Sequence, residues 1–404
     1  MKSKIALLPI LAVSMLASCG SNGGSSSEIT LTIWEDESNV AVVKELAEAW
    51  AGEYRLAYPL TPKININIVK QTEKSAIEKM STVASTGHGP DIASVTHDTI
   101  SSGVSNKLLA PVRFTDEVKA RMTDEALAAV EVNGEYYGYP ITAESMVLMY
   151  DKSQVSNPSV LASFESIKAN DLKVGLQLTG NDGGYYTWGL YTDSILFGES
   201  GKDNTQVDIA TAKSVANVQK FYSTYLDNIF DYAPNVNLNH VNAKRIAGVI
   251  CAPYMLSQMK NALGDNLGIA KYPTINGETA RPFSGFKAYA VSKYSTQGAL
   301  AQELANYLTS YESQAVRLQK LGYLPACHLD VNEDITALLE ADENAQIFKS
   351  SLEESVVMPS IPEMANFWIP MNNASTAFKN AGTGLTEELV RTNLTEVTNK
   401  LLGK

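Results

Sequence analysis

The sequence has few basic residues, cysteines and histidines, and each shortage argues against a class of protein. In 404 residues, Lys and Arg total 32 against 44 Asp and Glu, which gives a net charge of −12 and a pI near 5.0. Because nucleic-acid binding needs clustered cations, we expect no nucleic-acid partner. Three cysteines are too few for a disulfide scaffold. The four histidines are scattered without metal-ligand spacing, so no metal site is expected.

Long apolar runs are also missing, apart from one at the N-terminus. Ile5 to Leu16 is apolar over 12 residues, which is too short to span a bilayer as a helix. It follows a basic start and ends in Leu-Ala-Ser-Cys19, which resembles the bacterial lipobox, and a Gly/Ser-rich stretch comes next. We therefore predict a signal peptide over 1–18 and a tether over 19–28, lipid-anchored through Cys19 at the surface of a bacterial cell membrane. An ordinary signal peptide or an apolar N-terminal core helix is the alternative.

Two cysteines remain once Cys19 is assigned to lipid. Cys251 lies in the apolar run from Ile246, and Cys327 follows Leu-Pro-Ala. Such cysteines are typical of buried free thiols, although a bridge between the two stays open.

The chain after the tether alternates between strand and helix patterns. Strands are predicted over Ile29–Trp34, Ile64–Val69 and Ile92–Val95, and amphipathic helices over Val40–Trp50 and Glu73–Ser85. The order β-α-β-α-β is typical of a parallel, doubly wound sheet.

Acidic residues follow two of these strands directly. Glu35 and Asp36 come after the first strand, and Asp98 comes after the third. Ligands of such sheets bind beyond the carboxyl ends of the strands, so these carboxylates are candidate ligand-binding residues. A solvated acidic loop and a helix N-cap are the alternatives for them.

A second α/β region begins near Glu144 and continues to the C-terminus as further strands and helices. The predicted strands are Met146–Tyr150, Val174–Leu178, Ile246–Ala252 and Leu267–Lys271. The predicted helices include Tyr185–Leu196, Thr211–Leu226, Leu300–Leu308 and Ser313–Leu321, with a break at Met358–Pro362 among the last helices.

Five segments in order resemble the extracellular solute-binding proteins of ABC transporters, in the group that holds maltose- and maltodextrin-binding proteins. They are Trp34–Glu37, Ser85–Ile92 (STGHGPDI) with its continuation to Pro111, Gly138–Lys152 (GYPITAES followed by LMYDK), Ala252–Tyr254, and Met358–Trp368. Together they cover about residues 29–404.

The resemblance implies a two-lobe, periplasmic-binding-protein-like α/β fold. Each lobe would be a sheet flanked by helices, with hinge crossovers and a ligand cleft between the lobes. The expected N-terminal lobe is 29–143 plus 284–329, and the expected C-terminal lobe is 144–283 plus 330–404.

The resemblance also assigns site residues. The hydroxyl groups at the edge of a sugar ring donate hydrogen bonds to carboxylates, and its apolar faces pack on aromatic rings. The residues that match family positions are Asp98, Glu144, Tyr185, Tyr254 and Trp368, to which Glu35 and Asp36 are added as strand-end carboxylates. Tyr186 and Trp188 are alternatives to Tyr185, and Trp34 and Trp50 are expected in the core.

The resemblance implies that the protein captures an oligosaccharide and delivers it to the permease subunits of an ABC importer. Maltose or a maltodextrin is the first candidate for that oligosaccharide. The sequence contains no GxSxG, HExxH, P-loop or Rossmann motif, so neither an enzyme nor a cofactor is expected. A glycosidase, a binding protein for another oligosaccharide, glycerol phosphate or a peptide, and a surface adhesin are the alternatives.

Overall fold

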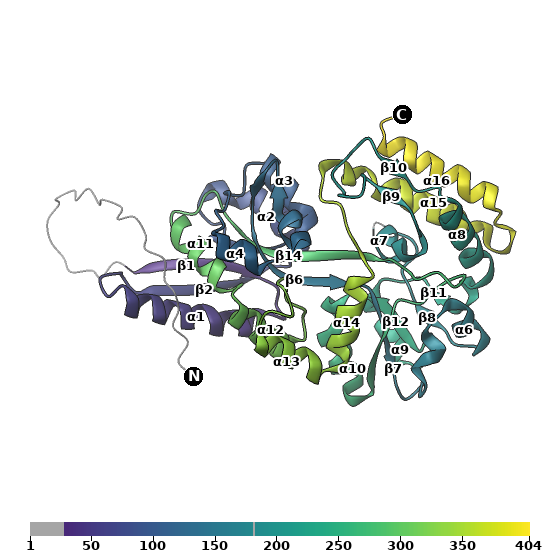
Figure 1. Ribbon diagram of the computed structural model, residues 1–404, viewed down its shortest axis with the longest axis horizontal. Coiled ribbons are helices and arrows are strands. Elements are labelled where there is room, and N and C mark those ends of the chain that lie inside the picture. The colour runs from purple at the N-terminus through teal and green to yellow at the C-terminus, as the bar shows by residue number, and fades with distance from the viewer. Residues whose placement is uncertain (1–27, 181) are drawn as a thin grey trace.

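The chain forms two lobes side by side (Figure 1). The computed structural model describes residues 28–180 and 182–404, so the predicted signal peptide and Cys19 lie outside the described residues. The strands β6 and β14 run from one lobe toward the other, and a segment before α15 crosses beside them (Figure 1). No helix within the described ranges is long and apolar enough to cross a membrane.

The first lobe is built on a six-stranded mixed sheet in the order β15-β14-β3-β1-β2, with β6 paired to β14. Its strands are β1 (Ile29–Glu35), β2 (Ile64–Lys70), β3 (Ile92–Thr96), β6 (Tyr139–Ser145), β14 (Phe283–Val291) and β15 (Val356–Val357). β1 runs parallel to β2 and β3, while β14 is antiparallel to β3 and β6. The three strands predicted at the start of the chain are confirmed.

Helices cover this sheet and close its core. They are α1 (Val40–Ala57), α2 (Glu73–Val83), α3 (Ile100–Ser105), α4 (Asp116–Arg121), α5 (Asp124–Val130), α11 (Gly298–Tyr307) and α12 (Tyr311–Leu321). α1 is amphipathic and packs its apolar face against the sheet; Trp50 on that face is 6% exposed. Trp34 at the end of β1 is 5% exposed, so both tryptophans lie in the core, as predicted.

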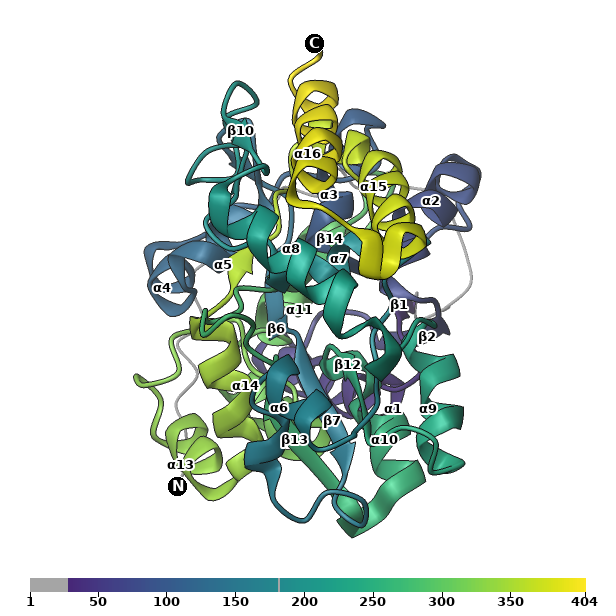
Figure 2. The same ribbon diagram turned by 90° about the vertical axis from the view of Figure 1, so that its right-hand side faces the viewer.

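The second lobe is built on a five-stranded sheet in the order β11-β8-β12-β7-β13. Its strands are β7 (Val147–Asp151), β8 (Val174–Gly175), β11 (Ile229–Phe230), β12 (Gly248–Cys251) and β13 (Leu267–Lys271). Figure 2 looks onto this lobe, with α8, α15 and α16 above these strands and α9 and α10 to their right. The free thiols of Cys251 and Cys327 are both buried.

The remaining elements belong mostly to the second half of the chain. The helices are α6 (Phe164–Ala169), α7 (Gly183–Thr187), α8 (Ala212–Thr224), α9 (Pro234–Asn242), α10 (Leu256–Leu263), α13 (Glu333–Ala341), α14 (Glu343–Glu353), α15 (Trp368–Ala381) and α16 (Glu387–Leu401). Two small sheets pair β4 (Glu131–Val132) with β5 (Glu135–Tyr136), and β9 (Ile195–Leu196) with β10 (Val207–Asp208).

The helix predicted over Tyr185–Leu196 is wrong beyond its first turns. α7 ends at Thr187, a 3₁₀ turn covers Trp188–Leu190, and the segment ends in the short strand β9. Tertiary packing overrides the helical pattern, because the Trp188 ring stacks 4.5 Å from Phe283 and Asp193 takes a positive φ of 59°. The predicted strand from Val174 is likewise shorter, since β8 ends at Gly175.

A buried histidine ties the crossing segments together. The ring Nε2 of His97 donates to the carbonyl oxygen of Met358 at 2.9 Å, and Nδ1 accepts from the amide of Phe286 at 3.2 Å. These partners assign the neutral tautomer with its proton on Nε2. The Ser101 hydroxyl donates to the carbonyl of Ser360 at 2.5 Å. The first lobe thereby holds both β14 and the segment that leads into α15.

Candidate ligand-binding site

Glu144 lies on β6, close to the point where the chain passes from the first sheet to the second. It faces Gly285 of β14 in the antiparallel register, and Lys287 lies diagonally from it on the same face. Lys287 donates to Glu73 at 3.1 Å, and its ammonium lies 5.6 Å from the centre of the Tyr323 ring. Two carboxylates therefore share one nearly buried lysine at the junction of the lobes.

The low solvent exposure of this cluster shifts the pKa values of its acidic and basic side chains. Burial raises the pKa of Glu144 above its ordinary value of 4.5; Lys287 opposes this shift and Glu73 adds to it. Burial alone would lower the pKa of Lys287, but the carboxylates of Glu144 and Glu73 raise it above its ordinary value. Lys287 is thus a permanent cation that holds two acidic side chains in a partly dehydrated place.

An aromatic surface faces this cluster from the second lobe. Tyr185 lies on α7, Tyr254 lies in the 3₁₀ turn after β12, and Trp368 begins α15; all three are partly exposed. A Cβ added to Gly285 would lie 3.9 Å from the hydroxyl oxygen of Tyr185, which places that hydroxyl over β14 beside Glu144. The predicted residues Glu144 and Tyr185 therefore lie near each other at the lobe junction.

Buried aromatic residues position these three rings from behind. The hydroxyl of Tyr186 hydrogen-bonds that of Tyr254 at 2.6 Å, and the Phe367 ring packs edge-on 5.1 Å from Trp368. Tyr186 is 6% exposed, so it supports the surface rather than forming it.

Trp188, the other alternative to Tyr185, is also buried, at 2% exposed. Its ring lies between Phe283 and Phe367, 4.5 and 5.6 Å from their centres. Of the three candidates for the stacking position, Tyr185 is the one with an accessible face.

Asp98 reaches the same place from the end of β3. It sits in the 3₁₀ turn His97–Thr99 and is partly exposed. Burial, followed by the nearby carboxylates of Glu144 and Asp98, raises the pKa of the Tyr185 hydroxyl well above its ordinary value. The structure thus gathers Asp98, Glu144, Tyr185 and Tyr254 around one region, and α15 brings Trp368 to the same side of the second lobe.

Glu35 and Asp36 are engaged in local contacts instead. Glu35 is fully buried and accepts from the Tyr289 hydroxyl at 2.6 Å and from the Asn39 amide at 3.0 Å. Asp36 accepts from the backbone and hydroxyl of Ser38 at 3.0 and 2.7 Å, in the turn that leads into α1. Neither is placed with the aromatic surface, and their role in ligand binding stays a prediction.

Sequence reasoning missed Glu73, Lys287 and Tyr323, which complete the charged cluster. One signal was present: Lys287 is the single charged residue in the strand FSGFKAYAV, all nine residues of which are buried. A lone lysine in such a strand needs a partner, because an unpaired buried charge is costly. Glu73 gave no comparable signal, since an acidic residue in a first helical turn is common.

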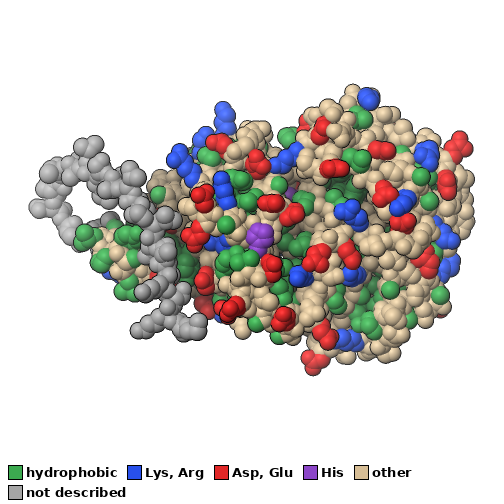
Figure 3. Space-filling view, viewed as in Figure 1, with side chains coloured by type: hydrophobic (Ala, Val, Ile, Leu, Met, Phe, Trp, Pro, Cys, Tyr) green, Lys and Arg blue, Asp and Glu red, His purple; other side chains and the backbone are tan. Residues whose placement is uncertain are grey.

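An ion pair bridges the lobes at the rim of this region. Lys74 of α2 lies 2.6 Å from Asp182, which precedes α7. Both side chains are largely exposed, so the pair contributes at most about 1 kcal/mol. The space-filling view shows the surface hollowed between the two lobes (Figure 3).

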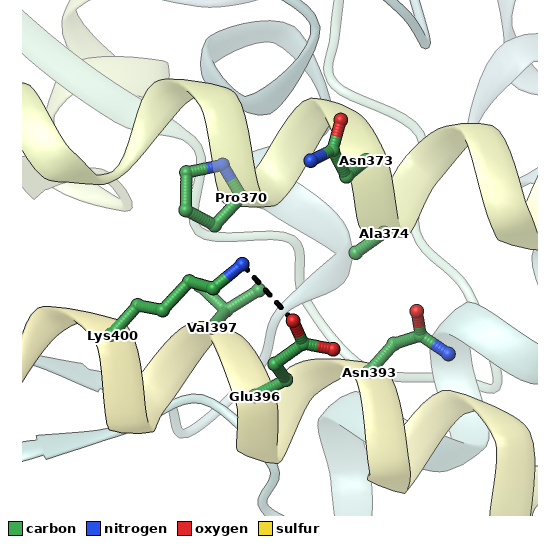
Figure 4. Close-up of a pocket in the computed structure, with 7 residues that line it drawn as sticks. All are labelled: Pro370, Asn373, Ala374, Asn393, Glu396, Val397 and Lys400. Carbon is green, nitrogen blue, oxygen red and sulfur yellow. Dashed lines mark ion pairs between the residues drawn. The ribbon is translucent and has the colours of Figure 1, made fainter. Parts of the chain in front are cut away.

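A separate small cavity lies between α15 and α16, away from the lobe junction. Figure 4 shows Pro370 and Asn373 on one helix facing the Glu396–Lys400 ion pair, of 3.0 Å, on the other. The cavity holds about 20 Å³, which is room for about one water molecule. It is too small for a sugar. A larger hollow of about 290 Å³ beside α13 has no aromatic ring in its lining, so the lobe junction, which has both rings and carboxylates, is the candidate ligand-binding site.

The arrangement suits binding rather than bond cleavage. Flat rings on one lobe face carboxylates on the other lobe and the hinge, and these groups match the apolar faces and hydroxyl rims of a carbohydrate. Among residues 28–180 and 182–404, no group of three or more His, Cys, Asp or Glu side chains is placed to hold a metal ion.

Comparisons with known proteins agree with this geometry. The family described as "Bacterial extracellular solute-binding protein" matches residues 53–345, well over half of the chain. The galactooligosaccharide-binding protein of Bacillus subtilis is 27% identical over 90% of this chain and 89% of its own length. A maltooligosaccharide ABC transporter solute-binding lipoprotein of Streptococcus pneumoniae is 26% identical over 90% of this chain and 88% of its own length.

Solved structures share the fold at lower identity. The ligand-free maltodextrin-binding protein MalE1 of L. casei BL23 is 19% identical and superposes with a TM-score of 0.77, covering 93% of this chain and 99% of that one. MalX of Streptococcus pneumoniae, solved with maltopentaose, is 21% identical with a TM-score of 0.76 over 92% and 99%. The two-lobe α/β fold expected from the sequence is confirmed, and the chain belongs to the bacterial extracellular solute-binding proteins.

Proposed function

We propose that the chain captures maltose or a maltodextrin outside the cell and delivers it to the permease subunits of an ABC importer. One observation carries the proposal: three partly exposed aromatic rings, Tyr185, Tyr254 and Trp368, lie on the lobe that faces the carboxylates of Asp98 and Glu144. The family is one of solute-binding transport receptors, not enzymes.

The charges of the site favour a neutral, hydroxyl-rich ligand. Glu73, Glu144, Asp98 and Asp182 outnumber Lys287 and Lys74 around the junction, and each lysine already pairs with a carboxylate. A phosphate ester or another anion would be repelled there, because the carboxylates are in excess and both lysines already pair with one. This balance argues against glycerol phosphate as the ligand.

The relatives narrow the class of sugar to two. Two relatives from S. pneumoniae are named for maltooligosaccharides, and the B. subtilis relative of similar identity is named for galactooligosaccharides. An α-linked glucose oligomer is the first candidate, and a galactooligosaccharide is the second.

Function then consists of selective capture and closure. A ligand that contacts rings on one lobe and carboxylates on the other stabilises the closed arrangement by its differential affinity for it. In this proposal 29–143 plus 284–329 and 144–283 plus 330–404 move as the two lobes around the crossing segments. The short strand β15, although it falls in the second set, pairs with β14 of the first sheet and forms part of the hinge.

The anchoring of the receptor is part of the same proposal. Diacylation of Cys19 after removal of 1–18 would hold the chain at the outer surface of a bacterial membrane, next to its permease. Mass spectrometry of the protein recovered from membranes of the producing cells tests this: a diacylglycerol-modified Cys19 is expected, and an unmodified thiol or a different N-terminus contradicts it.

A thermal-shift panel tests the ligand. A ligand that binds the native state alone raises the unfolding midpoint by mass action. We expect rises with maltose, maltotriose and longer maltodextrins, and none with glycerol 3-phosphate or a peptide mixture. A rise with galactooligosaccharides alone would replace the first candidate by the second, and silence with every sugar would overturn the proposal.

A further inference from the structure

The two most exposed large hydrophobic residues described lie together at the far tip of the first lobe. Leu60 is 100% exposed and Leu56 is 84% exposed. Leu56 is in the last turn of α1 and Leu60 is in the loop that leads to β2. Figure 3 shows hydrophobic side chains at this left-hand end, where Figure 1 places the end of α1. Exposed leucines side by side mark a contact surface more often than a lone one does.

The loop presents Leu60 on a rigid support. The Thr61 amide donates to the Tyr58 carbonyl at 2.9 Å, which closes a turn with Pro59 and Leu60 at its two central positions. Proline at the first central position fixes such a turn. Behind it the ring of Tyr54 lies 4.8 Å from that of Tyr58, which continues a ladder from the core. A leucine at the apex of a fixed turn is held out toward solvent.

The tip combines aromatic, apolar and basic residues. Residues 54–63 read YRLAYPLTPK, with two tyrosines, two leucines, Arg55 and Lys63, and no acidic residue, in a protein of net charge −12. Tyrosine, leucine and basic side chains together are typical of segments that lie in a membrane interface, where cations meet lipid phosphates.

The chain enters the structure at the same tip. The Ile29 amide donates to the Lys63 carbonyl at 2.9 Å, and Glu28 pairs with the Lys63 ammonium at 3.5 Å. Eight residues lie between Cys19 and Glu28, so the two are at most about 30 Å apart when the chain is extended. A lipid on Cys19 would therefore keep the tip within reach of the bilayer.

We propose that the tip formed by Leu56 and Leu60, with Arg55 beside them, docks on the lipid surface to which the chain is tethered. The proposal rests on the lipid anchor in the proposed function. The contact itself is weak, but a short tether supplies a high local concentration of membrane, so a small apolar surface is enough. Docking by this tip, which lies at the end of the first lobe away from α15 and α16, leaves the lobe junction open to ligand (Figure 1).

Quenching by brominated lipids tests the docking. The mature chain is coupled through Cys19 to maleimide-lipid vesicles that contain phosphatidylglycerol; the other two thiols are buried and do not compete. One variant carries Leu60→Trp as a reporter. The control carries Val331→Trp, at a 65%-exposed position between α12 and α13. Unchanged unfolding midpoints establish that both variants fold.

We expect the emission of Leu60→Trp to shift to the blue and to lose intensity in brominated vesicles, and that of Val331→Trp to do neither. Equal signals from the two variants, or none from Leu60→Trp, would overturn the docking. Self-association of the uncoupled chain that Leu56→Ser/Leu60→Ser abolishes would instead assign the tip to a second copy, and would also overturn it.

A maltotriose titration of the coupled samples separates this proposal from the proposed function. Sugar binding without quenching rejects the docking alone. Quenching without sugar binding leaves the docking in place and rejects the ligand.

Discussion

Replacing Lys287 by methionine removes the cation that pairs with the acids of a nearly buried cluster. The side chains of Lys287 and Glu73 are 11% and 9% exposed and lie 3.1 Å apart, and Glu144 lies beside them. Methionine fills a similar volume without a charge, so packing is largely kept and two carboxylates lose their counter-charge. Breaking a buried pair in this way costs about 3–5 kcal/mol, because a dehydrated charge is left uncompensated.

The stability lost by Lys287→Met depends on pH, and the pKa shift of Glu144 gives the direction of that dependence. Burial already raises the pKa of Glu144 above 4.5 while Lys287 opposes the shift, so Lys287→Met raises that pKa further. A carboxyl whose pKa is raised by folding binds its proton more tightly when folded, so stability falls as the pH rises above the unfolded value. The destabilisation by Lys287→Met is therefore larger at pH 8 than at pH 5.

Urea unfolding at pH 5 and pH 8, followed by tryptophan fluorescence, measures both effects. The matched control is Lys271→Met, which breaks an exposed pair with Glu354 and costs at most about 1 kcal/mol. Adding Glu73→Gln to Lys287→Met should recover part of the lost stability, since one of the two uncompensated acids is then neutral. A cost equal to that of Lys271→Met, or a cost independent of pH, would refute the view that Lys287 compensates buried acids.

Three further predictions concern the site and the core. Trp368→Ala should lower maltotriose affinity by about 30-fold with the fold kept. Phe378→Ala, whose ring is fully buried on the same helix against Tyr222, should instead cost about 3–5 kcal/mol of unfolding free energy. Calorimetry measures the affinities and urea unfolding the stabilities, and equal effects of the two changes on binding would contradict the prediction. Gly183→Ala should weaken sugar binding because its Cβ would collide with the Leu178 carbonyl oxygen and displace α7; unchanged affinity would show that α7 tolerates the shift. Burial raises the pKa of the Cys327 thiol to about 12, so in the chain from residue 28, which lacks Cys19, this thiol should react with Ellman's reagent at pH 8 only after unfolding, and fast reaction of the native chain would contradict its burial.

Local patterns were sufficient to predict the strands of the first lobe. In β2 the alternation of Ile64, Ile66 and Ile68 with polar residues marks a half-buried strand, and β1 and β2 pair residue by residue as neighbouring parallel strands. The helix from Tyr185 failed for the opposite reason, since its end is decided by the packing of Trp188 on Phe283, almost a hundred residues away in sequence.

The candidate site, too, was predicted only in part. Asp98, Glu144, Tyr185, Tyr254 and Trp368 were named by their resemblance to family positions. The structure brings the first four to one region of the molecule, and Trp368 lies on α15 of the second lobe. Their partners Glu73 and Lys287 are 214 residues apart in sequence and meet only through the sheet and its covering helix. Such pairs follow from the tertiary fold, which no local pattern encodes.

Calorimetric titration with maltotriose of the chain from residue 28, beside its Trp368→Ala and Ile369→Ala variants, tests the central claim most directly. Ile369 is the next residue on α15, is 69% exposed and is not part of the aromatic surface. We predict saturable binding of one maltotriose to the parent, the same affinity for Ile369→Ala, and a large loss for Trp368→Ala. Absence of binding to the parent, or equal affinity in all three proteins, would contradict an oligosaccharide site at the lobe junction.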